Sequence, residues 1–190
     1  MLHHLLNIIL WLPLFGLLFI LFIPSRYKDA IRWTALSCTI FTFLMSFYLY
    51  LKFDITAPGM QKPFEIVVPW IEQFHIYYRL GVDGISLPMI LLTGLLCILC
   101  VLCSWKIEKS VKAYFALFLM LECSVLGVFM ALDFFLFYVF WEVMLIPMFF
   151  LIGVWGGENK EYAAIKFFLY TFAGSVLMLV GMIALYFLSG

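Results

Sequence analysis

The chain has 190 residues, of which 67% are hydrophobic and only 12% are charged, and its formal net charge is zero. A soluble domain of this length is nearer half apolar and a quarter charged, so the composition excludes an ordinary soluble protein and indicates an integral membrane protein. Nothing in the charge balance favours nucleic acid as a partner. Apolar runs that continue for about 20 residues favour membrane-spanning helices over the short alternating strands of a barrel.

The sequence predicts an all-α membrane protein, a six-helix polytopic bundle in a single transmembrane domain over residues 1–190. The expected spans are residues 5–23, 31–51, 84–104, 113–132, 133–155 and 163–188. At a rise of about 1.5 Å per residue, each span reaches roughly the 30 Å thickness of the hydrocarbon layer. The first apolar run has no Lys/Arg-rich start and no small-residue cleavage site after it, so we expect a retained span and not a signal peptide.

A long connection, residues 52–83, separates the second span from the third. Its runs FEIVVPWI (64–71) and FHIYYRL (74–80) are rich in β-branched and aromatic residues. This pattern predicts a short extracytoplasmic β-hairpin. Asp83 or Ser86 is expected to cap the third helix, because short polar side chains accept hydrogen bonds from the free N–H groups of a first helical turn.

Lysine and arginine are concentrated in the connections after the first, third and fifth spans. These connections contain Arg26, Lys28 and Arg32, then Lys106, Lys109 and Lys112, then Lys160. The turn after the fourth span has no basic residue, and the long connection balances its basic residues with acidic ones. Since basic connections stay in the cytoplasm, we expect these three to face the cytoplasm and the amino terminus to face outside.

The fifth span carries an ionisable residue, Glu142, near its middle. A charged group at mid-membrane costs about 2.5–3.5 kcal/mol on insertion scales, so such a residue points to an ion or proton site. Pro147 lies five residues later and cannot donate to the carbonyl of Val143, which weakens the helix and frees an acceptor near the carboxylate. The alternative is a structural carboxyl that is protonated or hydrogen-bonded to a neighbouring helix.

Two further ionisable residues, Glu122 and Lys166, are candidates for the same site. Glu122 lies about ten residues before the turn at 132–133 and Glu142 about ten after it, so antiparallel helices would place both carboxyls at one depth, roughly 15 Å below the outer surface. Spacing fixes the depth but not the side that each carboxyl faces. Lys166 enters the sixth span by about one turn. It is either a positive neighbour that favours ionised Glu142 or a residue that snorkels to the interface.

Cys97, Cys100 and Cys103 form a C-x-x-C-x-x-C pattern that looks like part of an iron–sulfur signature. The usual fourth cysteine and its proline are missing, and the three lie in an apolar span, so we expect no cluster. We interpret all five cysteines as reduced thiols, and the histidines have no metal-like spacing. The residues themselves therefore predict neither a metal site nor a cofactor site in this chain.

Three stretches carry a resemblance to a known family. They are YRLGVDGISLPMILLT (78–93), GVFMALDFFLFYVFWEVMLIPMFFLIGVWGG (127–157) and AAIKFFLYTFAGS (163–175). With them the chain resembles subunit M, or chain 4, of the proton-pumping NADH-quinone oxidoreductase, respiratory complex I. The segment WEVMLIP is highly specific, whereas the first 77 residues match in layout rather than in motif.

The resemblance implies an antiporter-like, proton-translocating subunit in the membrane arm of a complex in the bacterial cell inner membrane. Members have about fourteen spans, so this chain would be an amino-terminal fragment. In the family, a glutamate that falls on Glu142 pairs with a lysine on a seventh helix. The implied partners are the other membrane-arm subunits, lipid and protons. NADH, FMN, iron–sulfur clusters and quinone would be used elsewhere in the complex.

From the sequence we expect proton translocation coupled to NADH oxidation and quinone reduction in other subunits. The chain would then be a membrane subunit of a translocase, with no redox centre of its own. A subunit of a multi-subunit sodium/proton antiporter or of a related membrane-bound hydrogenase would show similar helices and the same glutamate, although residues 78–93 favour complex I. A third interpretation is a structural scaffold in which Glu142 is inert.

Overall fold

The computed structural model describes residues 4–54 and 64–189, and residues 55–63 of the long connection lie outside the described part. Its long helices are α1 (Leu5–Phe22), α2 (Lys28–Lys52), α3 (Ser86–Cys103), α4 (Val111–Met130), α5 (Phe134–Trp155) and α6 (Lys160–Ser189). Six helices of the described chain are long and apolar enough to cross a membrane. The predicted all-α, six-helix class is confirmed, and the chain is a multi-pass membrane protein.

Three helices begin earlier than the apolar pattern predicts, α2 at Lys28, α4 at Val111 and α6 at Lys160. At α2 and α6 the extra turn is polar and is held by a contact with another part of the chain. Lys28 pairs with Glu108 of the α3–α4 connection. Lys160 Nζ donates to the carbonyl of Val154 at 2.9 Å. Hydropathy locates the apolar part of a span, so it misses a first turn that lies at the polar rim.

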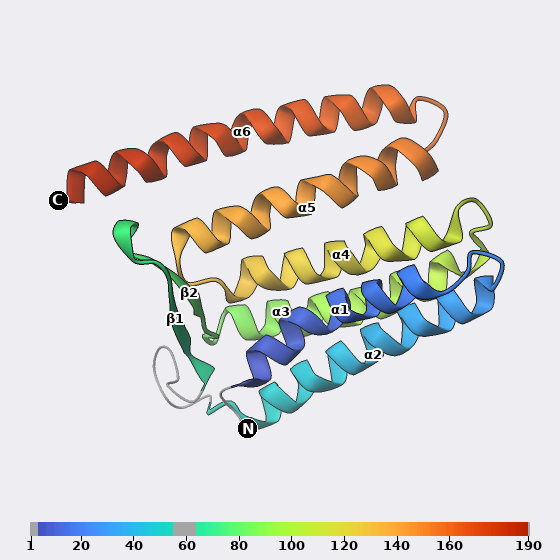
Figure 1. Cartoon of the computed structure of the whole chain (residues 1–190), viewed down its shortest axis with the longest axis horizontal. Coiled ribbons are helices and arrows are strands. Elements are labelled where there is room, and N and C mark those ends of the chain that lie inside the picture. Colours follow the sequence, from blue (N-terminus) through green and yellow to red (C-terminus); the bar gives the residue numbers. More distant parts are fainter. Residues whose placement is uncertain (1–3, 55–63, 190) are drawn as a thin grey trace.

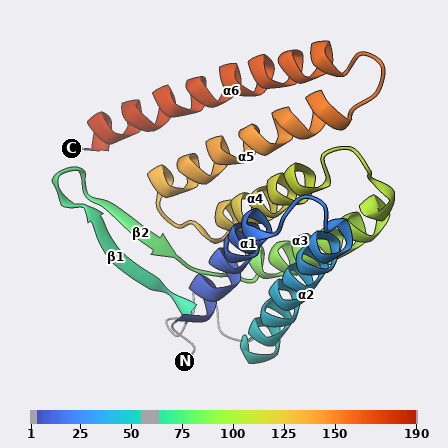
Figure 2. The ribbon, with the colours of Figure 1, turned by 45° about the vertical axis from the view of Figure 1, so that its right-hand side comes forward.

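The helices run up and down beside one another, with their connections gathered at two ends (Figure 1). One end holds the hairpin, the α4–α5 turn and both ends of the described chain. The other end holds the three basic connections, including the short 3₁₀ turn η4 (Ser104–Lys106). The contacts of α4 extend to α1, α2, α3 and α5, whereas α6 packs mainly against α5 (Figure 2). The bundle is therefore dense around α4 and thin at α6.

Glycine residues allow the closest helix approaches. Within lipid there is little hydrophobic force between helices, so close packing of small residues carries much of the association. Gly16 of α1 faces Cys38 of α2, where a Cβ on the glycine would lie 2.5 Å from the sulfur. Gly127 of α4 faces the ring of Phe140 on α5, and a Cβ there would lie 2.3 Å from Cδ1. A larger residue at either position would force the helices apart.

The predicted hairpin is confirmed. Strands β1 (Ile66–Ile71) and β2 (Ile76–Leu80) are antiparallel, with Val68 opposite Tyr78 and a register irregularity between Pro69 and Ile71. The turn between them contains the 3₁₀ segment η3 (Glu72–Phe74). An irregularity beside a proline fits an exposed two-stranded ribbon, because the missing N–H leaves no gap in a wider sheet.

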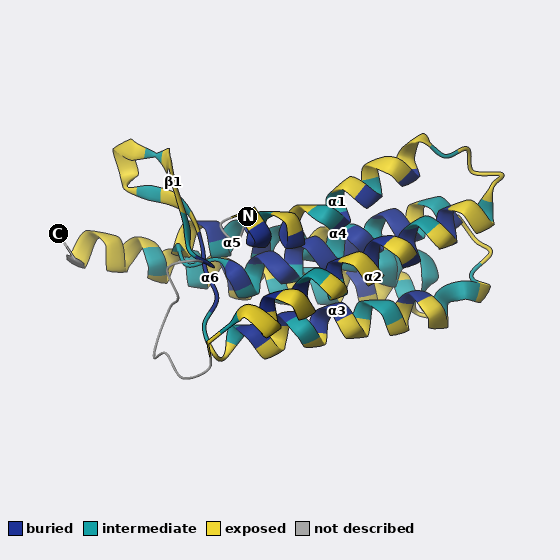
Figure 3. Cartoon of the chain, turned by 90° about the horizontal axis from the view of Figure 1, so that it is seen from below, coloured by how far each residue is buried: buried dark blue, intermediate teal, exposed yellow. Residues whose placement is uncertain are grey.

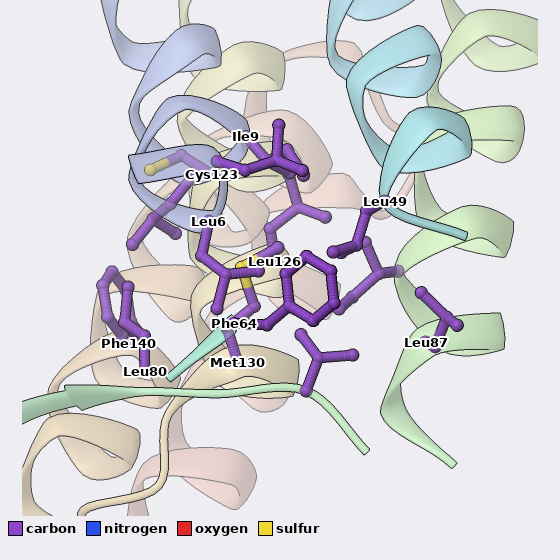
Figure 4. Packing of buried hydrophobic residues seen from close by; sticks show 14 of the residues in the cluster. Leu6, Ile9, Leu49, Phe64, Leu80, Leu87, Cys123, Leu126, Met130 and Phe140 are labelled. Carbon is purple, nitrogen blue, oxygen red and sulfur yellow. The ribbon is translucent and has the colours of Figure 1, made fainter. Parts of the chain in front are cut away.

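The hairpin is fastened to the α4–α5 turn by backbone hydrogen bonds. Gly81 N–H donates to the carbonyl of Met130, and Leu132 N–H donates to the carbonyl of Arg79, each at 2.9 Å. Beneath these bonds lies a buried cluster shown in Figure 4. It includes Leu6, Ile9, Leu49, Phe64, Leu80, Leu87, Cys123, Leu126, Met130 and Phe140. The hairpin is thus part of the folded bundle.

Burial falls steeply from α4 to α6, and Figure 3 shows that the end of α6 beyond the bundle is mostly exposed. In the most apolar 18-residue window of each helix, 56% of residues are buried in α4, 22% in α5 and 6% in α6. The outer faces of α5 and α6 carry large exposed apolar side chains such as Phe150, Leu169 and Leu177. A surface of this kind suits lipid or further helices, and it leaves Glu142 near the edge of the bundle.

Candidate functional site

Helix α5 is fixed at its start by Asp133. This side chain accepts hydrogen bonds from Phe135 N at 2.9 Å and Leu136 N at 3.2 Å, which satisfies two free N–H groups of the first turn. Its second oxygen accepts from Tyr77 N of the hairpin at 3.2 Å. One carboxylate therefore caps α5 and ties it to β2, so the position of Glu142 relative to the hairpin end of the bundle is set. The helix continues through Pro147, which is buried.

Glu142 lies where α5 faces α6. One of its carboxylate oxygens, Oε1, is buried and has no hydrogen-bond partner among the described residues. One turn earlier on the same face of α5 lies Tyr138, and Ser175 of α6 is buried with its hydroxyl donating to the carbonyl of Phe172 at 2.9 Å. The Glu142 carboxylate thus has one buried oxygen without a hydrogen-bond partner, which disfavours its ionised form.

Glu122 lies inside the dense part of the bundle. Its side chain is 1% exposed, and both carboxylate oxygens are buried without a hydrogen-bond partner among the described residues. The thiols of Cys38 on α2, Cys97 on α3 and Cys123 on α4 are close enough to interact electrostatically with it. A lone ionised carboxylate in such surroundings would be strongly disfavoured by desolvation.

The two carboxyls share a depth but not a site. Glu122 lies eight residues before the last residue of α4, and Glu142 lies eight after the first of α5, so both are about 12 Å from the shared turn. Glu122 is buried on α4, whereas Glu142 on α5 is only partly buried. Neither makes a hydrogen bond to the other.

Lys166 does not join either carboxyl in the described part of the chain. It is exposed on α6, and its ammonium group lies 5.6 Å from the centre of the Tyr162 ring, one turn earlier. This cation–π contact holds the lysine toward the basic end of the helix. The geometry is that of a residue snorkelling to the membrane interface.

The three cysteines of the C-x-x-C-x-x-C pattern lie along α3, where Cys97 is half-buried and Cys100 and Cys103 are exposed. Within residues 4–54 and 64–189, no group of three or more His, Cys, Asp or Glu side chains is placed to hold a metal ion. The pattern's spacing of three residues distributes the sulfurs over about two helical turns, which separates them along the axis.

An apolar hollow among the described residues is separate from both carboxyls. It measures about 580 Å³ and lies between α1, α4, α5 and the hairpin, with walls that include Trp11, Tyr78 and Phe140. Neither Glu122 nor Glu142 lines it. Proton chemistry therefore has to be sought along the helix interfaces and not in this groove.

At the opposite end of the bundle, Arg32 forms hydrogen bonds that join two of the basic connections. Its guanidinium donates to Asp29 at 2.8 Å, to the carbonyl of Ile107 at 3.0 Å and to Glu108 at 2.9 Å. Lys28 binds the same Glu108 carboxylate. These contacts join the α1–α2 and α3–α4 connections, and hydrogen bonds from the two cations hold the pKa of Glu108 below its usual value.

The sequence reasoning did not single out Tyr138, Ser175 or the Arg32 network. A signal for Tyr138 was present, because a residue four positions before Glu142 lies on the same helix face. Ser175 lies on another helix, and the side that its buried hydroxyl faces depends on the rotation of α6 about its axis. Apolar residues all around a helix leave that rotation unspecified.

Known proteins support one class for this fold. The family model of the NADH:quinone oxidoreductase/Mrp antiporter transmembrane region matches residues 131–190. NADH-quinone oxidoreductase subunit M of Rhodobacter capsulatus is 47% identical over 193 aligned positions, covering 99% of this chain and 37% of that protein. A chain of respiratory complex I from Thermus thermophilus with bound NADH superposes with a TM-score of 0.82 at 30% identity, covering 97% of this chain and 36% of that one.

A second solved structure shares the fold alone. A chain of the membrane-bound sulfane sulfur reductase, an archaeal respiratory membrane complex, superposes with a TM-score of 0.82 at 22% identity, covering 98% of this chain and 28% of that one. The matched structures are thus chains of respiratory membrane complexes. The chain spans about a third of the length of the relatives it matches.

The six-helix fold and the match over residues 131–190 make this chain similar to antiporter-like membrane subunits. Over the residues it contains, the chain is similar to NADH-quinone oxidoreductase subunit M.

Proposed function

We propose that this chain carries part of a proton-translocating membrane-arm subunit of an NADH-quinone oxidoreductase. The observation that carries the proposal is Glu142, a carboxyl in the middle of a membrane-spanning helix with one buried, unpartnered oxygen. Such a group is costly within a membrane and is kept where it transfers an ion or proton. The 47% identity to a subunit M supports the same assignment.

The proposed mechanism is electrostatic. Glu142 takes up a proton when it is isolated in its apolar surroundings and releases it when a positive charge approaches, because an opposite charge favours the ionised form and desolvation favours the neutral one. Lys166 contacts Tyr162 and not Glu142 in this conformation. The approaching charge is therefore either Lys166 in another conformation or the lysine on a seventh helix that the family resemblance implies.

The proposed partners and location of the chain follow from its role in proton translocation. Oxidation of NADH and reduction of quinone, with FMN and iron–sulfur clusters, belong to other subunits, and this chain supplies no redox centre. Its partners are the other membrane-arm subunits, lipid and protons. We assign it to a bacterial inner membrane with the basic end of the bundle in the cytoplasm and the amino terminus outside. An impermeant thiol reagent applied to intact cells should then spare single cysteines placed at the basic end.

A sodium/proton antiporter subunit is the second candidate function. The observation in its favour is the matching family model, whose description includes the Mrp antiporter beside NADH:quinone oxidoreductase. The two functions differ in what drives transport and in the ion moved. Proton uptake that depends on NADH oxidation and persists without sodium supports the first, whereas sodium-dependent exchange without any electron donor supports the second.

The direct test replaces Glu142 in the full-length subunit. Glu142→Gln keeps the size but cannot exchange a proton, so pumping and coupled quinone reduction should fall at least tenfold while the complex assembles. Glu142→Asp keeps the charge, moved by about one bond, and should retain partial activity, since a charge displaced so little still couples to a nearby partner. Glu158→Gln makes the same chemical change in the exposed α5–α6 connection and serves as the control.

Assembly, NADH-driven quinone reduction and membrane potential have to be measured separately on the same preparations. Loss of potential with intact assembly supports the relay role. Normal pumping with Glu142→Gln rules it out and leaves the scaffold interpretation.

A further inference from the structure

A polar layer separates two apolar clusters in the four-helix core formed by α1 to α4. The cluster nearer the hairpin includes Leu126 of α4 (Figure 4), and the cluster nearer the basic end includes Leu119 of the same helix. Glu122 lies between these two leucines on one face of α4, three residues after the first and four before the second in chain order. The corresponding part of α2 contains three buried hydroxyl residues: Thr39, Thr42 and Ser46.

A close contact among three helices fixes the level of this layer. A Cβ on Gly16 of α1 would lie 2.5 Å from Sγ of Cys38 on α2 and 3.2 Å from Cδ1 of Leu119 on α4. About one helical turn from these residues toward the hairpin end, the same faces carry one residue each: Pro13, Thr42 and Glu122. The carboxyl of α4 is therefore level with a hydroxyl residue of α2 and a proline of α1.

Helix α3 meets α2 at the same level. A Cβ on Gly94 would lie 3.3 Å from the Cα of Phe43, the residue that follows Thr42. Thr93, the neighbour of Gly94, is buried. Because α4 packs against α1, α2 and α3, all four helices contribute to the layer that contains Glu122.

The hydroxyl groups of this layer have already used their hydrogens. Thr42 and Thr93 each donate to the carbonyl four residues earlier on their own helices, at 3.1 and 2.7 Å. A hydroxyl has one hydrogen, so both oxygens remain as acceptors. Pro13 has no N–H, so the carbonyl of Ile9 loses the donor that a helix normally supplies. The layer therefore presents oxygen acceptors from three helices.

Glu122 adds a negative charge to these acceptors. Its side chain is 1% exposed, and neither carboxylate oxygen has a hydrogen-bond partner among the described residues. A proton on this carboxyl would have no acceptor within hydrogen-bond distance, and the ionised carboxyl has no donor. Oxygens that share a cation lie further apart than hydrogen-bonded oxygens do, so the absence of direct hydrogen bonds among these groups fits a cation site.

We propose that the polar layer binds one small monovalent metal cation such as sodium. Glu122 supplies the charge, and the hydroxyl oxygens of Thr42 and Thr93 with the carbonyl of Ile9 supply neutral ligands. Hard oxygen ligands suit such an ion. One positive charge neutralises one carboxylate, whereas a divalent ion would leave an uncompensated charge within the membrane. The ion stabilises the core and takes no part in transfer at Glu142, so the site does not depend on the proposed function.

The test measures how fast the buried thiol of Cys38 reacts with N-ethylmaleimide in the intact purified complex, with mass spectrometry of the labelled peptide. Labelling requires the core to open, and an ion bound to the closed core slows opening by mass action. Replacing choline chloride with sodium chloride at constant ionic strength should slow the reaction by at least about threefold. The exposed thiol of Cys103 should react equally fast in both salts.

Three variants test the ligands. Glu122→Gln keeps the size of the side chain but removes the charge, so the sodium dependence should disappear. Thr42→Val keeps the shape but removes the oxygen, so the sodium concentration at half effect should rise by about tenfold. Thr34→Val makes the same change near the basic end of α2, where Thr34 donates to the carbonyl of Ala30 at 2.8 Å, and should leave that concentration unchanged.

The proposal is overturned if sodium and choline give equal labelling rates in the unmodified complex, or if the sodium dependence persists in Glu122→Gln. A rate that follows pH but not sodium would assign a proton to Glu122 and also overturn it. If Glu122→Gln does not assemble, Thr42→Val decides, because an unchanged half-effect concentration there rejects the site. Normal pumping in Glu142→Gln would reject the proposed function without affecting this site.

Discussion

The two halves of the bundle each contain a carboxyl within a membrane-spanning helix, and the surroundings of the two carboxyls differ. In the core formed by α1 to α4, Glu122 is 1% exposed, and both of its carboxylate oxygens are buried without a hydrogen-bond partner among the described residues. On α5, at the edge of the bundle, Glu142 is only partly covered, and its Oε1 is buried without such a partner. Complete desolvation favours the neutral carboxyl, whereas partial cover leaves room for a change of protonation state. The proposed function therefore assigns proton exchange to the edge and a supporting role to the core.

A substitution at the junction between the two halves, where α4 packs against α5, is expected to have the largest effect on stability. Gly127→Ala places a Cβ 2.3 Å from the Phe140 ring, so α4 and α5 have to separate. Overpacking of this kind costs about 1–3 kcal/mol. Thermal unfolding of the solubilised protein should show the loss.

Gly181→Ala is the matched control, because nothing lies within 4 Å of the added Cβ on α6. It should be neutral or slightly stabilising, as alanine is the better helix former. Equal stability of the two variants would contradict the tight α4–α5 junction.

A substitution in the Arg32 network, at the basic end of the bundle, is expected to have a smaller effect on stability. Arg32→Met keeps the apolar stem but removes three hydrogen bonds, to Asp29, Ile107 and Glu108. The arginine side chain is 9% exposed while both carboxylates are largely exposed, so water compensates the partners and the loss should be about 1–2 kcal/mol. Denaturant unfolding measures it.

Arg26→Met is the control for that variant, since Arg26 is exposed and contacts Tyr27, its neighbour in the chain. It should change stability by less than about 0.5 kcal/mol. If both arginine variants lose stability equally, the network does not join the two connections.

The smallest expected effect is a pH dependence at the same network. Hydrogen bonds from Lys28 and Arg32 lower the pKa of Glu108 from its usual 4.5. A lowered pKa in the folded state adds stability above the usual value, and this contribution disappears as the pH falls through the folded value. Glu108→Gln should therefore lower the melting temperature at neutral pH and converge with the unmodified protein below about pH 4. A constant difference at all pH values would contradict this origin.

The sequence was sufficient for the six spans because uninterrupted apolar runs report membrane crossing directly. It also predicted the hairpin, and the Asp83 cap is present, with Oδ1 accepting from Ser86 N at 2.7 Å. These are features of local order along the chain. The depth of Glu122 and Glu142 followed from counting residues, since the rise of a helix is constant.

The sides that the two carboxyls face could not be predicted. Apolar residues surround α5 on all faces, so no polar stripe marks its inward side. The hydrogen bond that Tyr77 N donates to Asp133 joins residues far apart in sequence, and it depends on the packing of the hairpin against the α4–α5 turn. Contacts between residues far apart in the chain produce no periodic pattern in a single sequence.

The separation of Glu122 from Glu142 is most directly tested by a double-mutant cycle on proton pumping. Glu142→Asp retains measurable activity, and Glu122→Gln replaces the core carboxyl with a neutral group of the same size. If the two sites are independent, the factors by which each change lowers the pumping rate should multiply in the double variant to within about twofold, a coupling below about 0.5 kcal/mol. A double variant that pumps no more slowly than Glu142→Asp alone, although Glu122→Gln by itself reduces pumping, would show that the two carboxyls act as one site.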